Sequence, residues 1–341
     1  MKFGQVPVDR AAGHILAHSV PLPGGRLRKG MVLGAGELAA LKAAGWTRIA
    51  VARLEDGDLH ENAAAARLAA ALVPDPARAG LRLSEPFTGR VNLIAEGPGV
   101  ARINAQRVDA VNRVHPMITL ATVPRWQRME PGGMVATVKI IAYGVPGVSV
   151  SAAAAHAGGA VSLVRPVLRD AVLIETLVGS ERSRPGGDKG NDKGWRMMQA
   201  RLDRLGVALA PRQTVEHRTE PLAAAIAARR EALILVLTGS ATSDPADIAP
   251  EALRRAGGAV ARFGMPVDPG NLLFLGDLAG RAVIGLPGSA RSPALSGVDW
   301  VLERVICGIA PSSDEIAAMG VGGLLKEIPT RPQPRAGRPG G

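Results

Sequence analysis

The sequence is poor in cysteine and in aromatic side chains. Its one cysteine, Cys307, excludes an internal disulfide, a zinc site built from several cysteines and a cysteine-ligated iron–sulfur cluster. Because Cys307 ends the expected apolar helix 301–307, we expect a small core residue there. Aromatic residues make up only 3% of the chain, so stacking platforms for nucleic-acid bases are nearly absent.

Long apolar runs are also missing. No stretch approaches 18 unbroken apolar residues, and the start of the chain lacks the apolar region of a signal peptide. We therefore expect a cytoplasmic protein with no membrane partner. The 341 residues are 47% hydrophobic and 21% charged, which is typical of a globular protein with two or three domains.

The net charge of +11 favours anionic partners. Part of it comes from arginines after Thr330, and an arginine-rich solvated surface explains it better than a nucleic-acid footprint does. We expect no nucleic-acid partner, since a phosphorylated small molecule needs only a local positive patch.

The chain is organised around residues 233–293, where two apolar strands each run into a loop of small polar residues. The strands begin at Leu233 and Ala282, and helices are expected at 248–256 and 294–307. Strands buried on both faces and alternating with helices indicate a parallel sheet. Ligands in such sheets bind beyond the carboxyl ends of the strands, where both loops fall.

The composition of these loops suits a phosphate, because glycines, hydroxyls and one arginine offer close hydrogen-bond donors. The candidate cofactor-binding residues are Thr238, Gly239, Ser240 and Thr242 in the first loop, Pro287, Gly288, Ser289, Arg291 and Ser292 in the second, and Asp192 in the polar stretch 179–194. A purely structural alternative stays open for the acids of the first loop: Asp244 as N-cap, with Asp247 near the third helical position.

Further strands and helices are expected before and after residues 233–293, and together they predict a sheet with helices on both faces. We expect strands at 171–177 and 207–210, helices at 195–205 and 220–230, and a hairpin turning at 277–280. This order predicts an α/β fold, a three-layer α/β/α sandwich with a mostly parallel sheet. The stretch 179–194 is interpreted either as a solvated loop or as a lid.

Three segments in order resemble the molybdopterin-binding domain of molybdopterin molybdenumtransferases and adenylyltransferases. They are Leu237 to Asp247, Asp268 to Leu273, and Gly285-Leu-Pro-Gly-Ser-Ala-Arg-Ser292. The sequence departs from the family pattern at Asp268 and Asn271, where the family has lysines, and at Ser240, where it has a second glycine.

The resemblance implies a protein of molybdenum cofactor biosynthesis whose ligand is molybdopterin or adenylyl-molybdopterin. It further implies a transferase that inserts molybdate with release of AMP, with Asp247 as catalytic residue and Mg²⁺ ligand. The alternative is a non-catalytic carrier that delivers the cofactor to a molybdoenzyme, and a weaker one is a nucleotide-hydrolysing enzyme. We expect a homo-oligomer, with other cofactor-biosynthesis proteins or a molybdoenzyme as further partners.

The chain divides into four expected parts: an N-terminal molybdenumtransferase-like segment 1–78, a small mixed α/β insertion 79–167, the molybdopterin-binding domain 168–311, and a C-terminal extension 312–341 with a disordered tail. Helices are expected at 35–44, 60–72, 105–114 and 151–160. His14 and His18 have the i, i+4 spacing of a helical metal site but no third ligand nearby, so packing or a surface role is favoured.

Overall fold

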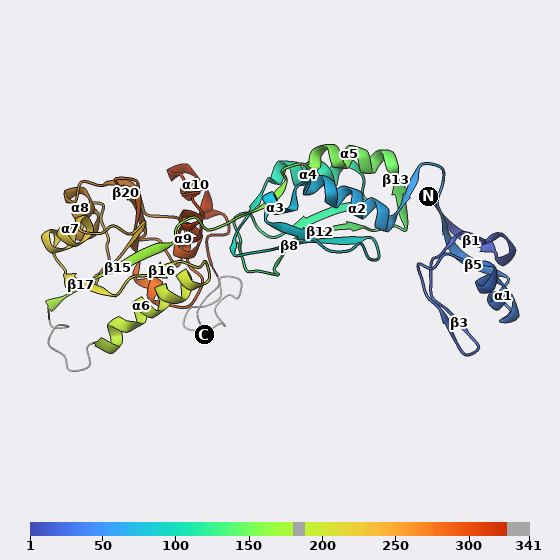
Figure 1. The fold of residues 1–341 in the computed structure, drawn as a ribbon, viewed down its shortest axis with the longest axis horizontal. Coiled ribbons are helices and arrows are strands. Elements are labelled where there is room, and N and C mark those ends of the chain that lie inside the picture. The colour runs from blue at the N-terminus through green and yellow to red at the C-terminus, as the bar shows by residue number, and fades with distance from the viewer. Residues whose placement is uncertain (180–187, 326–341) are drawn as a thin grey trace, which may run out of the picture. The chain divides into compact units, whose positions relative to one another are not determined.

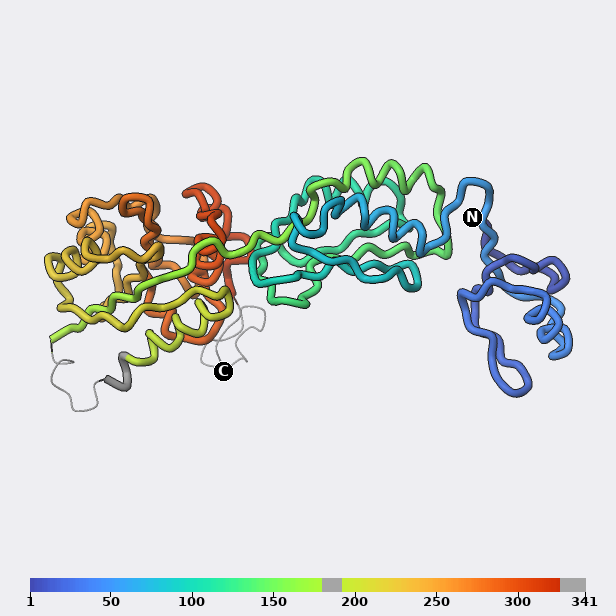
Figure 2. The backbone as a smooth tube through the Cα atoms, viewed as in Figure 1, coloured from blue at the N-terminus to red at the C-terminus, as the bar shows by residue number. Residues whose placement is uncertain are grey.

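The computed structural model describes residues 1–179 and 188–325, and the chain forms two compact units. Unit 1 is residues 1–97 and 101–164, and unit 2 is residues 98–100 together with the chain from 165 onward. Figure 1 labels many of the elements of both units, and Figure 2 traces the backbone. Among the described residues, no helix is both long and apolar enough to cross a membrane. The tail expected to be disordered lies outside the described residues.

The first 53 residues of unit 1 surround a small core of their own. Their elements are β1 (Lys2–Pro7), η1 (Val8–Arg10), β2 (Ile15–Leu16), β3 (Val20–Leu22), β4 (Gly25–Leu27), α1 (Ala35–Ala43) and β5 (Arg48–Arg53). The antiparallel sheet has the order β1-β5-β2, and Leu41 of α1 packs in the core beside Val51 of β5. The helix predicted at 35–44 is confirmed.

The helical spacing proposed for His14 and His18 is wrong, because this stretch forms β2 and flanking bends. A backbone in that conformation does not bring residues i and i+4 onto one helical face. Across the described chain, no three His, Cys, Asp or Glu side chains are grouped so that they could hold a metal ion.

The rest of unit 1 is a helix-covered antiparallel sheet. Its helices are α2 (Glu61–Leu72), α3 (Pro76–Ala79), α4 (Ala105–Val114) and α5 (Gly147–Ala157). Its strands are β6 (Asp58–His60), β7 (Leu81–Leu83), β8 (Arg90–Ala95), β9 (Gly99–Ile103), β10 (Ile118–Thr122), β11 (Arg128–Met129), β12 (Met134–Ile140), β13 (Gly144–Pro146) and β14 (Val161–Val164). The main sheet has the order β10-β12-β8-β7, and Figure 1 shows α2, α4 and α5 on one side of β8 and β12. Helix α2 shares its hydrophobic core with β8 and β12, whereas the first 53 residues have a separate core. The boundary between the two cores therefore lies near residue 57, and not at residue 78, where the sequence analysis placed the end of the N-terminal segment.

Unit 2 is built on a seven-stranded mixed sheet. Its strands are β15 (Asp170–Leu177), β16 (Ala208–Leu209), β17 (Gln213–Glu216), β18 (Leu233–Leu237), β19 (Ala259–Phe263), β20 (Phe274–Leu278) and β21 (Arg281–Leu286). The order is β16-β15-β18-β21-β20-β19, with β17 also paired to β15. The strands β15, β16, β17, β18 and β21 are parallel, while β19 and β20 are antiparallel to their neighbours.

Two cores cover the two faces of this sheet. The helices are α6 (Asp188–Asp203), α7 (Thr219–Ala227), α8 (Ile248–Arg255), α9 (Gly297–Ile306) and α10 (Ser313–Ala317), with short 3-10 helices η3 (Gly288–Arg291) and η4 (Ala318–Gly320). Alternate residues of β15 face opposite sides, so that Leu173 joins α6 and α9 while Val172 joins α7 and α8. The predicted α/β fold with helices on both faces is confirmed, and Cys307 is buried as expected.

Two details of unit 2 differ from the sequence predictions. The helix expected to start at 195 starts at Asp188, so Asp192 lies on α6 and not in a loop. The last long helix starts at Gly297 rather than 294, because η3 and a short bend occupy residues 288–296. The rest of the expected lid, residues 180–187, lies outside the described residues.

Candidate functional site

The three central parallel strands end side by side. In the register of the sheet, Glu175 of β15 lies opposite Leu237 of β18, and Leu237 lies opposite Leu286 of β21. The loops that begin at Thr238 and Pro287 therefore leave the same edge of the sheet at the same level. This edge, at the carboxyl ends of the strands, is where parallel sheets bind ligands.

The segment before β20 reaches the same edge. Phe274 pairs with Gly285 near the carboxyl end of β21, so residues 268–273 enter the sheet there. Pro269 accepts a hydrogen bond at 2.9 Å from the backbone N–H of Gly297, the first residue of α9. All three segments that resemble the family therefore lie at one edge of unit 2.

A pair of buried hydroxyls shapes the first loop from within. Thr238 Oγ1 donates to the carbonyl of Ser240 at 2.6 Å and lies 3.2 Å from Thr242 Oγ1. Both threonines are at least 93% buried, whereas Ser240 is exposed. In this conformation the threonine hydroxyls hold the loop, and Ser240 offers its side chain to solvent.

Gly239 packs its backbone onto the end of β15. A Cβ at this position would lie 2.7 Å from the carbonyl oxygen of Thr176 and 3.1 Å from Cγ2 of Val178. The Gly239 N–H donates to Thr176 Oγ1 at 2.9 Å, and the same hydroxyl lies 2.8 Å from His217 Nδ1. Close packing within the protein therefore explains this glycine without any ligand.

Gly288 differs from Gly239 in its surroundings. Both glycines are exposed, but a Cβ built on Gly288 would meet no atom within 4 Å. Its φ also lies outside the left-handed region that favours glycine. Nothing in the described chain requires a glycine here, so the missing side chain leaves the first residue of η3 open to an approaching group.

Other residues of the second loop are buried or partly buried and make few hydrogen bonds. Ser289 Oγ is buried without a hydrogen-bond partner among the described residues. Ser292 Oγ accepts from the Ala294 N–H at 3.2 Å, and Pro287 is buried at the start of η3. A buried hydroxyl without a partner is uncommon in a folded protein, because it forfeits its hydrogen bonds with water.

Arg291 joins the two loops. Its Nη2 donates to the carbonyl of Thr238 at 3.1 Å, and the side chain is partly buried. The loops 238–247 and 287–292 thus meet at one edge of the sheet, as the sequence predicts. The guanidinium places a permanent positive charge at their junction.

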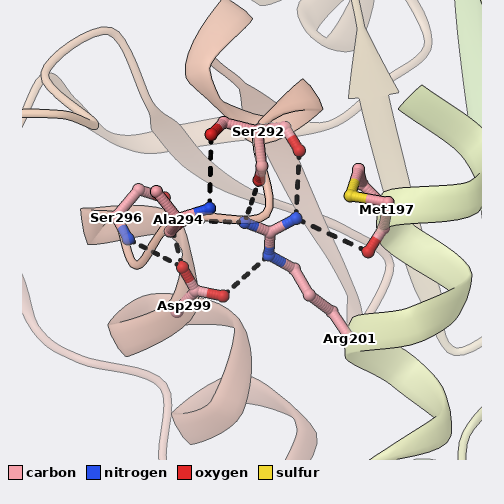
Figure 3. A network of polar contacts seen from close by, with 7 residues as sticks. Met197, Arg201, Ser292, Ala294, Ser296 and Asp299 are labelled. Carbon is pink, nitrogen blue, oxygen red and sulfur yellow. Dashed lines mark hydrogen bonds and ion pairs between the residues drawn. The ribbon is translucent and has the colours of Figure 1, made fainter. Parts of the chain in front are cut away.

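A buried arginine of α6 holds the second loop through hydrogen bonds to its backbone carbonyls (Figure 3). Arg201 Nε donates to Asp299 Oδ1 at 2.7 Å, Nη1 to Ala290 O at 3.0 Å, and Nη2 to Ser292 O at 2.9 Å and to Ala294 O at 3.3 Å. Asp299 also accepts from the Ser296 N–H at 2.8 Å. One guanidinium therefore fixes residues 290–294 against α6 and the start of α9.

A second buried ion pair lies beneath α6. Glu175 is fully buried, its Oε2 accepts from Arg212 Nε at 2.6 Å, and its Oε1 has no hydrogen-bond partner among the described residues. A Cβ on Gly194 would lie 2.7 Å from that oxygen, so the helix backbone covers it closely. Burial raises the pKa of Glu175 against the opposing effect of Arg212 and Arg291, and Asp192 adds to the rise.

Asp247 is the N-cap of α8, which corrects the structural alternative that placed the cap at Asp244. Its Oδ1 accepts from the Ile248 N–H at 2.7 Å and its Oδ2 from the Ser243 N–H at 3.0 Å. Asp244 instead accepts from the Ala246 N–H at 2.7 Å, a local turn contact. Both oxygens of the expected metal ligand thus already bind the backbone.

Asp192 forms an ion pair with Arg196 one turn further along α6. The residues that sequence reasoning missed are Thr176, Glu175, His217 and Arg201. The first two interrupt the apolar run 171–177 at its carboxyl end, which was a usable signal. His217 and Arg201 lie in ordinary polar and helical surroundings that gave none.

Comparison with known protein families gives a match for most of unit 2. Residues 176–305 match the family described as "Probable molybdopterin binding domain". Residues 5–53 match a family described as "Domain of unknown function (DUF8806)". The resemblance found in the sequence is confirmed: unit 2 contains a domain of the molybdopterin-binding family.

Comparison with whole proteins gives weaker likenesses. No curated protein matches the chain. A crystal structure of the molybdopterin biosynthesis moeA protein from Pyrococcus horikoshii is 13% identical, with a TM-score of 0.32, over 90% of this chain and 75% of that one. A molybdenum cofactor biosynthesis protein from Pyrococcus furiosus is 12% identical, with a TM-score of 0.26, over 92% of this chain and 66% of that one. Scores of this size add nothing to the family match.

Proposed function

We propose that unit 2 binds molybdopterin or adenylyl-molybdopterin in molybdenum cofactor biosynthesis, with the phosphate held between loops 238–247 and 287–292. The family match over residues 176–305 supports a phosphorylated pterin as the ligand. The observation that carries the proposal is the junction of the two loops, where Arg291 contacts Thr238. A guanidinium fixed by one hydrogen bond keeps other N–H groups for a phosphate, whose oxygens prefer charged donors.

Two features of the second loop support the same position for the phosphate. Gly288 leaves open space at the start of η3, so a phosphate oxygen can approach its backbone closely. The Ser289 hydroxyl is buried beside it and has no partner in the described chain. We propose that this hydroxyl donates to an oxygen of the phosphate.

The described residues do not fit a Mg²⁺ site built by the protein alone. Mg²⁺ prefers about six oxygen ligands, commonly with one or two carboxylates and substrate phosphates among them. Asp247 is already engaged by two backbone N–H groups, and the described part of the chain has no group of three or more His, Cys, Asp or Glu side chains that could hold a metal ion.

Two functions that differ in chemistry are compatible with such binding. In one, the chain is a molybdenumtransferase that releases AMP from adenylyl-molybdopterin and inserts molybdate. In the other, it carries the cofactor to a molybdoenzyme without turnover. The capping bonds of Asp247, together with Asp268 and Asn271 in place of the family's lysines, favour the carrier.

Binding is tested first on the full chain. Mass spectrometry of the purified protein is expected to detect a phosphorylated pterin that co-purifies with it. Titration of the fluorescent probe 6-hydroxymethylpterin phosphate, with its unphosphorylated parent as control, then measures the contribution of the phosphate. Arg291→Ala is expected to weaken binding of the phosphorylated probe by ~1.5–3 kcal/mol.

The matched control is Arg230→Ala, because Arg230 is exposed and precedes β18 at the opposite edge of the sheet. Equal affinity of wild type and Arg291→Ala for the phosphorylated probe would contradict the proposed position of the phosphate. Turnover is measured as AMP release from adenylyl-molybdopterin with molybdate and magnesium. Release by the wild type would support the transferase, and tight binding without release would support the carrier.

A further inference from the structure

A buried carboxylate lies on the same face of the sheet as the second loop. Along β15, Leu173 faces the core that α6 and η3 share, and Glu175, two residues further on, faces the same side. The exposure of Glu175 is 0%, although it lies near the carboxyl end of the strand, level with the last residue of β18. An ionisable group is therefore buried at the edge from which both loops leave.

Gly194 of α6 shows that Arg291 lies beside this carboxylate. A Cβ on Gly194 would be 2.7 Å from Glu175 Oε1 and 3.7 Å from Cγ of Arg291. Both side chains thus meet at the same point of the helix, and the guanidinium of Arg291 continues from there to the carbonyl of Thr238. A phosphate bound by Arg291 would bring its negative charge close to the Glu175 carboxyl.

The charges that act on Glu175 come from three different elements. Arg212, which precedes β17, donates from Nε to Glu175 Oε2 at 2.6 Å. Burial raises the pKa of Glu175, and Arg212 and Arg291 lower it. Asp192 of α6, which pairs with Arg196, raises this pKa further. The protonation of the carboxyl therefore depends on charges at η3 and at α6, on either side of it.

One oxygen of Glu175 is available for a proton. Its Oε2 is used by Arg212, whereas its Oε1 has no hydrogen-bond partner among the described residues. A second negative charge near a buried carboxylate favours the neutral carboxylic acid, because the two charges repel each other strongly where little water separates them. A proton on Oε1 would remove this repulsion and leave the bond between Oε2 and Arg212 in place.

We propose that Glu175 is a further functional residue of the phosphate site: its carboxylate takes up a proton from solvent when a phosphate binds beside Arg291. The proton bonds to a carboxylate oxygen, and no bond of the ligand changes. This inference rests on the proposed function, because it adds proton uptake to the same binding event. Affinity for the phosphorylated ligand then falls as pH rises and Glu175 stays ionised in the complex.

The experiment counts protons by calorimetry on the full chain. Titrations with 6-hydroxymethylpterin phosphate, in buffers of different ionisation enthalpy from about pH 5 to about pH 9, give the number of protons bound with the ligand. In Glu175→Gln the side chain is neutral at every pH. The wild type is expected to take up about half a proton more than this variant at the maximum, as a coupling of about one pKa unit implies.

The matched control is Glu220→Gln, because Glu220 is an exposed carboxylate of α7, on the opposite face of the sheet. Its proton uptake is expected to equal that of the wild type. The melting temperature of each variant shows whether it folds.

Affinity gives a second readout that a purely structural ion pair would not produce. At the alkaline end of the range, Glu175→Gln is expected to bind the phosphorylated probe about tenfold more tightly than the wild type, because it has no charge to repel the phosphate. Towards the acid end the two affinities should converge. Unphosphorylated 6-hydroxymethylpterin should show no such dependence, whereas weaker binding of both probes by Glu175→Gln at every pH would mean that Glu175 serves only the fold.

The wild type decides the question even if Glu175→Gln does not fold. Arg291 favours the doubly charged form of the phosphate, so the ligand itself releases protons on binding, and net uptake has to come from the protein. No net uptake at any pH would overturn the inference.

The outcomes also distinguish this inference from the proposed function. If the wild type does not prefer the phosphorylated probe, the proposed function fails and this inference fails with it. If the wild type prefers it and Arg291→Ala weakens it, but the wild type and Glu175→Gln bind the same number of protons, the role of Glu175 alone is overturned.

Discussion

Two glycines of the site should respond in opposite ways to the same substitution. In Gly239→Ala the new methyl would lie 2.7 Å from the carbonyl oxygen of Thr176, a backbone atom that cannot rotate away. The loop would have to shift, which also strains the 2.9 Å bond from the Gly239 N–H to Thr176 Oγ1. Overpacking of this kind costs about 1–3 kcal/mol. A loss of ~2 kcal/mol lowers the melting temperature of a unit of this size by about 4–8 °C.

Gly288→Ala adds its methyl to open space at an ordinary φ. A glycine replaced by alanine in a compatible conformation gains about 0.4–1 kcal/mol, because the unfolded chain loses freedom. We expect a melting temperature equal to or slightly above that of the wild type. The same methyl would stand where the phosphate approaches, so affinity for the phosphorylated pterin probe should fall about tenfold or more.

Scanning calorimetry on the full chain measures the first quantity, and fluorescence titration measures the second. The two variants should therefore separate: Gly239→Ala loses stability, and Gly288→Ala loses binding at full stability. If Gly288→Ala binds the probe as tightly as the wild type, no ligand approaches this glycine and our placement of the phosphate is refuted. If it melts as early as Gly239→Ala, the open space at residue 288 is refuted instead.

Three further substitutions or treatments test the polar interior of unit 2. Arg201→Met leaves Asp299 buried without its cation and should lower the free energy of unfolding by ~3–5 kcal/mol, measured by denaturant titration. The raised pKa of Glu175 means that the folded state binds its proton more tightly, so the stability of the wild type relative to Glu175→Gln should fall as pH rises above 4.5. Burial raises the pKa of Cys307 to about 12, so a thiol reagent at pH 8 should label it only as the protein unfolds; labelling of the native protein would contradict its burial.

The sheet of unit 2 was predictable where its strands are apolar throughout. All five residues of β18 are buried, and such a run has no periodicity that a helix or an exposed strand would show. The register of parallel neighbours then places the loops after β18 and β21 together without further information. The strands β17 and β19 escaped prediction because both contain exposed or half-exposed positions and β17 has a polar sequence.

The helix α6 shows where local sequence is a poor guide to a boundary. Its first turn contains glycine, lysine and aspartate residues, which are typical of loops, and nothing apolar precedes Trp195. The helix continues back to Asp188 all the same. Long-range packing, such as the close contact of Gly194 with Glu175, is absent from any pattern of neighbouring residues.

The polar side chains of the site were harder to predict the farther their partners lie along the chain. Asp247 bonds to the backbone within four residues, so its capping could be weighed from the sequence alone. Arg201 bonds to residues about 90 positions away, and helical spacing gives no hint of such partners. Thr176 and His217 are separated by 41 residues and meet only because β15 and β17 are adjacent strands.

The same reasoning explains why sequence could not assign roles to the glycines of the two loops. Gly239 and Gly288 each follow a buried strand, and each matches a glycine of the family pattern. Only the folded structure shows that the backbone of the neighbouring strand occupies the space beside Gly239, whereas the space beside Gly288 is open. A glycine that packing requires is expected whether or not a ligand binds, whereas a glycine with nothing near it has no such reason. The case for a ligand at this edge therefore depends on Gly288, Ser289 and Arg291 far more than on the first loop.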